Sequence, residues 1–179
     1  MLAKIREPCA SRIGVSANRV TALTGFSMEV SQMKKCSEVM TKNPFCCLPD
    51  ATLAEVSQTM KNKGIGSVLV VENAGPSKLV GIVTDRDIVL KAVASGLDPQ
   101  TTHVKDVMSR KIVTVRTDDD SRKALDAMSK HQLRRIPVVD KDGRIEGIIA
   151  QADVATRIND AGKTAAVVKQ ISQYSSSSR

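Results

Sequence analysis

The sequence is poor in aromatic residues, which make up 2% of its 179 positions and include no tryptophan. Proteins that hold single-stranded nucleic acids stack the bases on aromatic side chains, so a binding surface of that kind is disfavoured. Long apolar runs are also lacking, and no segment has the roughly 20 apolar residues that a membrane-spanning helix needs. Residues 1–30 lack the apolar core of a secretory signal. We therefore expect no membrane partner.

Cysteine and histidine are few and are poorly spaced for metal binding. The four cysteines form no C-x-x-C pair, and the two histidines lie near none of them in the sequence. Structural zinc sites usually take their ligands from such close pairs. We therefore expect no metal, and we interpret the cysteines as small buried hydrophobic residues in a reducing compartment. This interpretation predicts a cytoplasmic location.

The excess of positive charge is confined to the ends of the chain. The formal net charge is +8, but residues 36–158 carry eighteen Lys or Arg against sixteen Asp or Glu. Residues 1–35 carry six basic against two acidic side chains, and residues 159–179 carry three against one. A nearly neutral centre disfavours a basic groove for nucleic acid.

The sequence does contain an internal repeat. Apolar residues of the first half recur 68 positions later, and after a turn that is two residues shorter the spacing becomes 66. The last part of each unit reads GIVTDRD (81–87) or GIIAQAD (147–153). Pairs at a spacing of 68 include Val39 with Val107, Met60 with Met128 and Val68 with Ile136.

Both units predict the same order of secondary structure. Thr52 and Glu55 predict a capping box at the start of the first helix, and Asp120 predicts the cap of its counterpart. The sequence thus predicts an α+β fold made of two β-α-β-β-α units. The expected elements are a strand (45–48; 112–115), a helix (52–63; 120–131), two strands (67–71 and 79–83; 135–139 and 144–149) and a closing helix (85–95; 151–159).

The repeat, the element order and the G-h-h-T-x-x-D ending together resemble the tandem cystathionine-β-synthase (CBS) domain pair. Residues 85–99 and 131–139 are similar to stand-alone bacterial CBS pairs of the hypoxic response type. The resemblance implies one CBS repeat at 36–98 and another at 99–158, packed about a pseudo-twofold axis with ligand clefts between them. It also implies a disc-shaped homodimer. Residues 1–35 are expected to form a flexible extension, and residues 159–179 a C-terminal helix and tail.

The polar end of the repeat is the candidate ligand site. A carboxylate in the first turn of a helix can accept both hydroxyls of a ribose, which suits Asp87 and Asp153, and Thr84 can donate to a phosphate oxygen. The resemblance implies these roles, because the matching Thr and Asp of nucleotide-binding CBS pairs contact an adenosine nucleotide in this way. The alternative needs no ligand: Asp85 caps the second helix, and Asp87 is an ordinary acidic residue of its first turn.

The second unit departs from this pattern in two places. Ala150 stands at the position of Thr84, so we expect one cleft to bind better than the other. Arg134 and Arg135 stand where the first unit has Gly66 and a serine. A guanidinium matches phosphate geometry, so these arginines are expected either to contact a phosphate held by Thr84 or to be a solvated pair at a strand edge. Gly66 is expected to leave room for a base.

The adenine ring is expected near the lead-in to the first strand, where Asn43, Pro44 and Phe45 lie, with Val68 beneath it. The same apolar residues would also suit an ordinary hydrophobic core.

These patterns favour a regulatory protein that is not an enzyme, because no nucleophile, base and orienting group can be assembled from the motifs. We expect an adenosine nucleotide (AMP, ADP, ATP or NAD) to bind between the repeats and to bias their packing for a regulated protein whose identity the sequence does not give. The rival hypothesis is a ligand-free module that dimerises and presents a surface to a partner.

Overall fold

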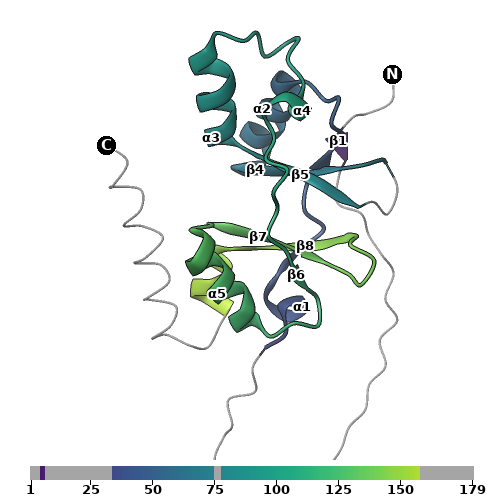
Figure 1. Cartoon of the computed structure of the whole chain (residues 1–179), viewed down its shortest axis with the longest axis vertical. Helices are drawn as coiled ribbons and strands as arrows, with labels where there is room; N and C mark the ends of the chain where they lie inside the picture. Colours follow the sequence, from purple (N-terminus) through teal and green to yellow (C-terminus); the bar gives the residue numbers. More distant parts are fainter. Residues whose placement is uncertain (1–4, 7–33, 75–77, 158–179) are drawn as a thin grey trace, which may run out of the picture.

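The computed structural model describes residues 5–6, 34–74 and 78–157. Two four-stranded sheets lie at the centre of the molecule, and helices cover their outer sides (Figure 1). The first sheet has the strand order β1-β3-β4-β5, and the second has the order β2-β8-β7-β6. The predicted α+β fold is therefore confirmed.

The two repeats contain the predicted elements in the predicted order. In the first repeat they are β3 (Cys46–Cys47), α2 (Leu53–Lys63), β4 (Ser67–Val71), β5 (Leu79–Thr84) and a helical segment made of α3 (Asp85–Asp87), the π-helix η1 (Ile88–Ala92) and the 3-10 helix η2 (Val93–Ser95). In the second repeat they are β6 (Val115–Arg116), α5 (Ser121–His131), β7 (Arg135–Val139), β8 (Ile145–Ala150) and α6 (Gln151–Arg157). Both first strands are shorter than the sequence predicted.

The long helices begin where the sequence predicted. The Thr52 side chain accepts a hydrogen bond from the Glu55 amide at 3.2 Å, and the Glu55 carboxylate accepts one from the Thr52 amide at 2.8 Å, which completes the capping box of α2. Asp120 accepts a bond from the Arg122 amide and caps α5. Each helix ends at a residue in the left-handed conformation, Gly64 (φ 63°) after α2 and Gln132 (φ 54°) after α5.

The segments that lead into each repeat exchange places. Residues of α1 (Cys36–Val39) pack in the second repeat's core with Leu125 and Ile136, whereas residues of α4 (Val104–Val107) pack in the first repeat's core. β2 (Thr41–Lys42) then pairs with β8, and Ser109 makes the corresponding bridge to Ile82 of β5. This reciprocal crossing joins the repeats, and it places each lead-in segment beside the other repeat.

The glycine that begins the motif is explained by the same exchange. The Met108 side chain lies where a Cβ on Gly81 would be, and the Met40 side chain lies where a Cβ on Gly147 would be. Only glycine lets the crossing methionine pack this closely on the strand.

Among the described residues, one element lies in the predicted N-terminal extension. β1 (Ile5–Arg6) pairs antiparallel with β3, with Ile5 opposite Cys47. Residues 1–4, 7–33 and 158–179 lie outside the described residues, so the predicted flexible extension and the predicted C-terminal helix and tail fall mostly or wholly outside them. Among the described helices, none is both long and apolar enough to cross a membrane.

Candidate functional site: a cleft between the two repeats

A cleft of about 510 Å³ lies between the end of β5 and the start of β7. The first repeat contributes the stretch from Thr84 to Asp87, and the second contributes Arg134 and Arg135. Four of the residues singled out in the sequence therefore lie around one cavity. The complete lining is Ile82, Thr84, Asp85, Arg86, Asp87, Ser109, Lys111, Ile112, Val113, Gln132, Leu133, Arg134, Arg135 and Pro137.

Thr84 and Asp87 are bonded to each other. Thr84 is the N-cap of α3: its hydroxyl oxygen accepts from the Asp87 amide at 3.1 Å, and its hydroxyl donates to Asp87 Oδ2 at 2.6 Å. The Thr84 amide donates to the same carboxylate oxygen at 3.1 Å. In the alternative that needs no ligand, Asp85 caps this helix; the cap is instead formed by Thr84, whose acidic capping-box partner lies three residues later.

Asp87 is also paired with a cation. Lys91 lies one turn further along the helix, and its Nζ is 2.7 Å from Asp87 Oδ1. Partial burial acts to raise the pKa of Asp87, but the Lys91 ammonium and the Thr84 bonds outweigh it and hold the pKa below its usual value. Asp87 is therefore an anion at neutral pH. Lys91 donates in addition to the Val107 carbonyl at 2.8 Å, which ties the helix to the end of α4.

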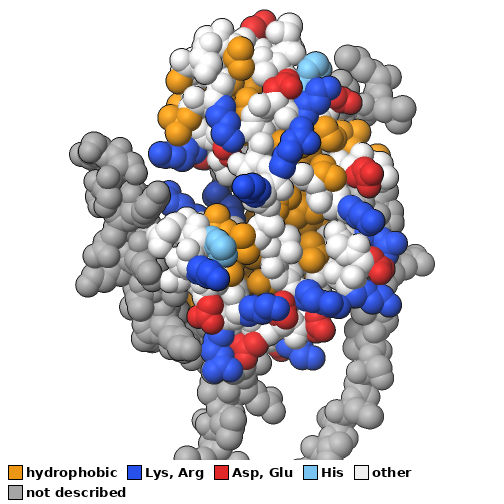
Figure 2. Space-filling model, in the orientation of Figure 1, with side chains coloured by type: hydrophobic (Ala, Val, Ile, Leu, Met, Phe, Trp, Pro, Cys, Tyr) orange, Lys and Arg blue, Asp and Glu red, His pale blue; other side chains and the backbone are white. Residues whose placement is uncertain are grey.

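Cationic side chains surround the rest of the cleft. Arg135 donates to the Gly66 carbonyl at 3.4 Å, and neither Arg86 nor Lys111 makes an ion pair within the described residues. Figure 2 shows Lys and Arg side chains gathered about the hollow between the two halves of the molecule. The space at Gly66, expected to admit a base, is taken up by Asp85 and Arg135, since a Cβ there would lie 2.8 Å from Asp85 Oδ2.

The apolar wall differs from the one expected for the adenine. Ile112 and Val113 line the cleft, whereas Asn43, Pro44 and Phe45 do not. The reason is the exchange of lead-in segments: Ser109, just before residues 111–113, pairs with Ile82 of β5, whereas Lys42, just before residues 43–45, pairs with Gly147 of β8. Val68 is fully buried in the core of the first repeat. A ligand role for Pro44, Phe45, Gly66 and Val68 stays a prediction.

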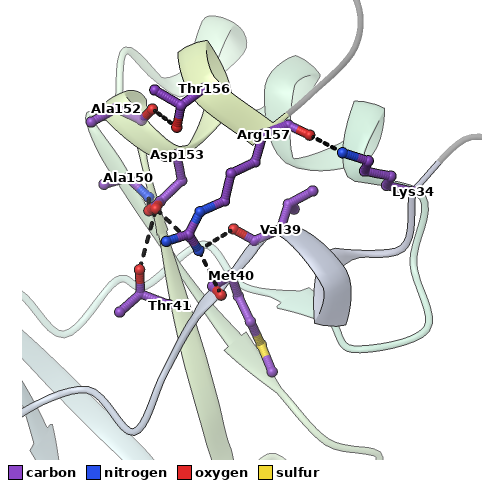
Figure 3. A network of polar contacts seen from close by, with 9 residues as sticks. All are labelled: Lys34, Val39, Met40, Thr41, Ala150, Ala152, Asp153, Thr156 and Arg157. Carbon is purple, nitrogen blue, oxygen red and sulfur yellow. Dashed lines mark hydrogen bonds and ion pairs between the residues drawn. The ribbon is translucent and has the colours of Figure 1, made fainter.

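Asp153, the counterpart of Asp87, is held in an internal network (Figure 3). Its carboxylate accepts bonds from the Ala150 amide at 2.8 Å and from the Thr41 hydroxyl at 3.2 Å, and it pairs with Arg157 at 3.4 Å. Thr41, on the crossing β2, thus supplies the hydroxyl that Ala150 lacks. Asp153 is 8% exposed and does not line the cleft, so its predicted ribose contact stays a prediction.

The chain belongs to the CBS domain family. The family model of the CBS domain matches residues 36–93 and 104–160. Hypoxic response protein 1 of Mycobacterium tuberculosis is 32% identical over 126 residues, which are 70% of this chain and 86% of that protein. The predicted resemblance to CBS pairs of the hypoxic response type is therefore confirmed.

Other relatives match only in part of their length. The chain spans 59% of the uncharacterized protein MK0525 of Methanopyrus kandleri (33% identical over 65% of this chain). It spans 24% of the inosine-5'-monophosphate dehydrogenase of Methanocaldococcus jannaschii (34% identical over 72% of this chain). The similarity to the dehydrogenase thus extends over a small part of that enzyme.

Three solved structures bear on the site. Hypoxic Response Protein I, with two coordinated zinc ions, matches with a TM-score of 0.63 and 31% identity, covering 70% of this chain and 99% of that one. The CBS pair of MJ0100, in complex with 5'-methylthioadenosine and S-adenosylmethionine, matches with a TM-score of 0.59 and 26% identity (69% and 94% covered). A hexameric CBS-CP12 protein from bloom-forming cyanobacteria matches with a TM-score of 0.63 and 29% identity (72% and 74% covered).

The first of these structures corrects the expectation about metal. The sequence led us to expect no metal, but Hypoxic Response Protein I, a close structural neighbour, has two coordinated zinc ions. The spacing argument was wrong because folding can bring together ligands that are distant in sequence. In the present chain, the described residues contain no group of three or more His, Cys, Asp or Glu arranged to hold a metal ion.

Sequence reasoning missed two parts of the cleft wall. Residues 111–113 carry no recognisable motif, and Gln132 was not singled out although it lies in the family-like stretch 131–139. The repeat did contain a signal for the first, because residues 111–113 are the counterparts of residues 43–45 at a spacing of 68. Applying that spacing together with the exchange of lead-in segments would have identified them.

Proposed function

We propose that the chain is a regulatory CBS pair without catalytic activity, and that it binds an adenosine nucleotide (AMP, ADP, ATP or NAD) in the cleft at Thr84. The observation that supports this most strongly is the convergence of Thr84 and Asp87 from one repeat with Arg134 and Arg135 from the other. A carboxylate that is ionised beside a set of cations suits a ligand carrying both ribose hydroxyls and phosphate.

Each part of the nucleotide has a suitable wall. Phosphate oxygens match Arg135 and Lys111, and the ribose hydroxyls match Asp87. A ribose that donates to Asp87 Oδ2 replaces the Thr84 hydroxyl bond, which frees that hydroxyl to donate to a phosphate. Ile112 and Val113 supply an apolar surface for the base.

Regulation follows from the contacts of Asp87. Lys91 bridges this carboxylate and the Val107 carbonyl at the end of α4, in the same lead-in segment whose residues 111–113 line the cleft. A ligand that bonds to Asp87 therefore changes the interactions of the lead-in segment and, through it, the packing of the repeats. A partner protein that prefers one packing would detect the change.

The proposal is tested by thermal unfolding with AMP, ADP, ATP, NAD and S-adenosylmethionine. A ligand present at 100 times its dissociation constant adds about 2.7 kcal/mol to the free energy of unfolding. We expect at least one phosphorylated nucleotide to do so, and we expect Thr84→Ala to weaken phosphorylated ligands while leaving adenosine nearly unchanged.

The second candidate function is a ligand-free interaction module. A specific observation favours it: the Thr84–Asp87 capping box and the Lys91 ion pair account for the polar motif as part of the fold. No stabilisation by any of the five ligands would support this module and reject the nucleotide sensor.

We also propose that the chain forms a homodimer in the cytoplasm. Support for the dimer comes from four exposed apolar side chains on and just after the helical segment that follows β5: Val89, Leu90, Val93 and Leu97. Their counterparts 66 positions later in the sequence are Ala155, Thr156, Asn159 and Lys163, which include no large apolar side chain. Among the neighbours, the CBS-CP12 protein is hexameric.

A further inference from the structure

Gln132, in the cleft wall, has two features that are unfavourable for folding: its backbone conformation and an unpaired buried side-chain oxygen. It ends α5 in the left-handed conformation with φ 54°, which non-glycine residues rarely adopt. Its side-chain Oε1 is buried and has no hydrogen-bond partner among the described residues. A strained backbone and an unsatisfied buried acceptor are both unfavourable for folding, and the two coincide at a residue that lines the cleft.

The corresponding position of the first repeat shows that the cap itself does not require a glutamine. Gly64 ends α2 with φ 63°, in the same conformation, and a Cβ there would meet nothing within 4 Å. Glycine is the residue that this conformation favours. The backbone conformation therefore does not explain why the second repeat has a glutamine at this position. Gln132 differs from Gly64 in its side chain.

The orientation of the amide follows from its neighbour. Gln132 Nε2 donates to the Ser129 carbonyl at 2.8 Å. Exchanging the amide nitrogen and oxygen would place two acceptors against each other, so the hydrogen-bond network assigns Oε1 as the unpartnered atom. This atom can only accept a hydrogen bond. The terminal torsion of glutamine is broad, so the amide can rotate to meet a donor that enters the cleft which Gln132 lines.

We propose that Gln132 recognises the base of the bound nucleotide by accepting a hydrogen bond from an exocyclic amine. This inference rests on the proposed function, because it concerns the same cleft. The adjacent Leu133, together with Ile112 and Val113, gives this part of the cleft the apolar lining that a base requires. A 6-amino purine supplies the donor, whereas a 6-oxo purine presents a carbonyl oxygen to Oε1 and leaves it unsatisfied. Gln132 thus selects adenine over hypoxanthine.

The test compares ATP with inosine triphosphate by titration calorimetry on the parent, Gln132→Gly and Gly64→Gln. The parent should bind ATP at least about tenfold tighter, because a site built around a hydrogen bond discriminates strongly against a ligand that lacks it. Gln132→Gly should lose most of this preference while its melting temperature rises by about 2–4 °C, since the cap strain is relieved. Gly64→Gln should lower the melting temperature and leave the preference unchanged.

Two other results would overturn the inference. Equal affinity of the parent for both nucleotides, or an unchanged preference in Gln132→Gly, would show that Gln132 does not read the base, although the cleft binds nucleotides. Failure of the parent to bind either nucleotide would reject the proposed function, and base recognition with it.

Discussion

At the scale of single residues, the charge of Asp87 links the cleft to protein stability. Because its pKa in the folded protein is lowered, the ionised form stabilises the fold at neutral pH. That contribution is complete above the unfolded pKa of 3.8 and is lost as the pH falls through the lower folded value.

We predict that Asp87→Asn lowers the free energy of unfolding by about 1 kcal/mol at pH 7, through the lost cap and Lys91 bonds. The difference from the parent should shrink as the pH falls below 3.8, where the carboxylate of the unfolded chain is protonated. Urea unfolding at pH 7 and pH 3.5 measures this, with Asp126→Asn on the exposed side of α5 as the control. A difference that is independent of pH would show that the charge of Asp87 is not involved.

At this scale, the sequence predicted Thr84, Asp87, Arg134 and Arg135 because their spacing forms a motif or breaks the repeat. It did not predict Gln132, because nothing in a lone glutamine indicates a left-handed backbone or an unpaired amide oxygen. It also did not predict that the Thr41 hydroxyl donates a hydrogen bond to Asp153, a bond that Ala150 cannot make. That bond joins residues 112 positions apart, and only the crossing of the lead-in segment brings them together.

At the scale of elements, two equivalent cations bind the carboxyl ends of the crossing helices α1 and α4. Arg157 donates to the Val39 and Met40 carbonyls at 3.1 and 3.0 Å, at the end of α1, while Lys91 donates to the Val107 carbonyl at the end of α4. Each cation also pairs with the aspartate one turn before it. Cations at the carboxyl end of a helix are favourable, because the last carbonyls there have no partner within the helix.

We predict that Arg157→Met destabilises the protein by about 1–3 kcal/mol, because it removes the donor from two carbonyls and leaves the buried Asp153 without its ion pair. Lys91→Met, which frees one carbonyl, should cost less. Thermal unfolding of both variants beside Lys130→Met, an exposed control on α5, measures the effect. If Arg157→Met unfolds at the temperature of the control, the cation does not hold α1.

The N-terminal segment gives a second prediction at this scale. We expect that deleting residues 1–30 leaves the melting temperature and the oligomeric state unchanged. The described part of this segment is β1, which adds a strand of just two residues to the edge of the first sheet. Calorimetry and sedimentation of the truncated protein test this. A large loss of stability would mean that the extension is part of the fold.

Element order was predictable because α2 and α5 carry a clear helical period over eleven residues and strands such as β4 are short apolar runs between turns. The exchange of lead-in segments was not predictable in the same way. α1 and α4 are four residues long, too short to show a helical period, and the sheet partners of the lead-in segments lie in the other repeat. The internal repeat shows that two units exist, but it does not show which unit a lead-in segment joins.

At the scale of the whole molecule, the apolar surface of the first repeat predicts how two copies meet. Val93 is 62% exposed, the most of the four exposed apolar side chains Val89, Leu90, Val93 and Leu97. We expect Val93→Asp to shift the protein from dimer to monomer at micromolar concentration, because a charge in the contact would be desolvated without a partner. Sedimentation velocity measures the shift, with Lys141→Asp in an exposed turn as the control. A parent that is already monomeric would reject the homodimer.

Across the whole molecule, the central claim is that the cleft between the repeats binds an adenosine nucleotide through Asp87. The most direct measurement is titration calorimetry with ATP on the parent, Asp87→Asn and Asp119→Asn. Asp119 is a matched control, because it too accepts a backbone bond and pairs with a lysine four residues later, outside the cleft. We predict one binding site per chain, weakened at least about tenfold in Asp87→Asn and unchanged in Asp119→Asn. Equal binding by all three proteins would contradict the proposed site.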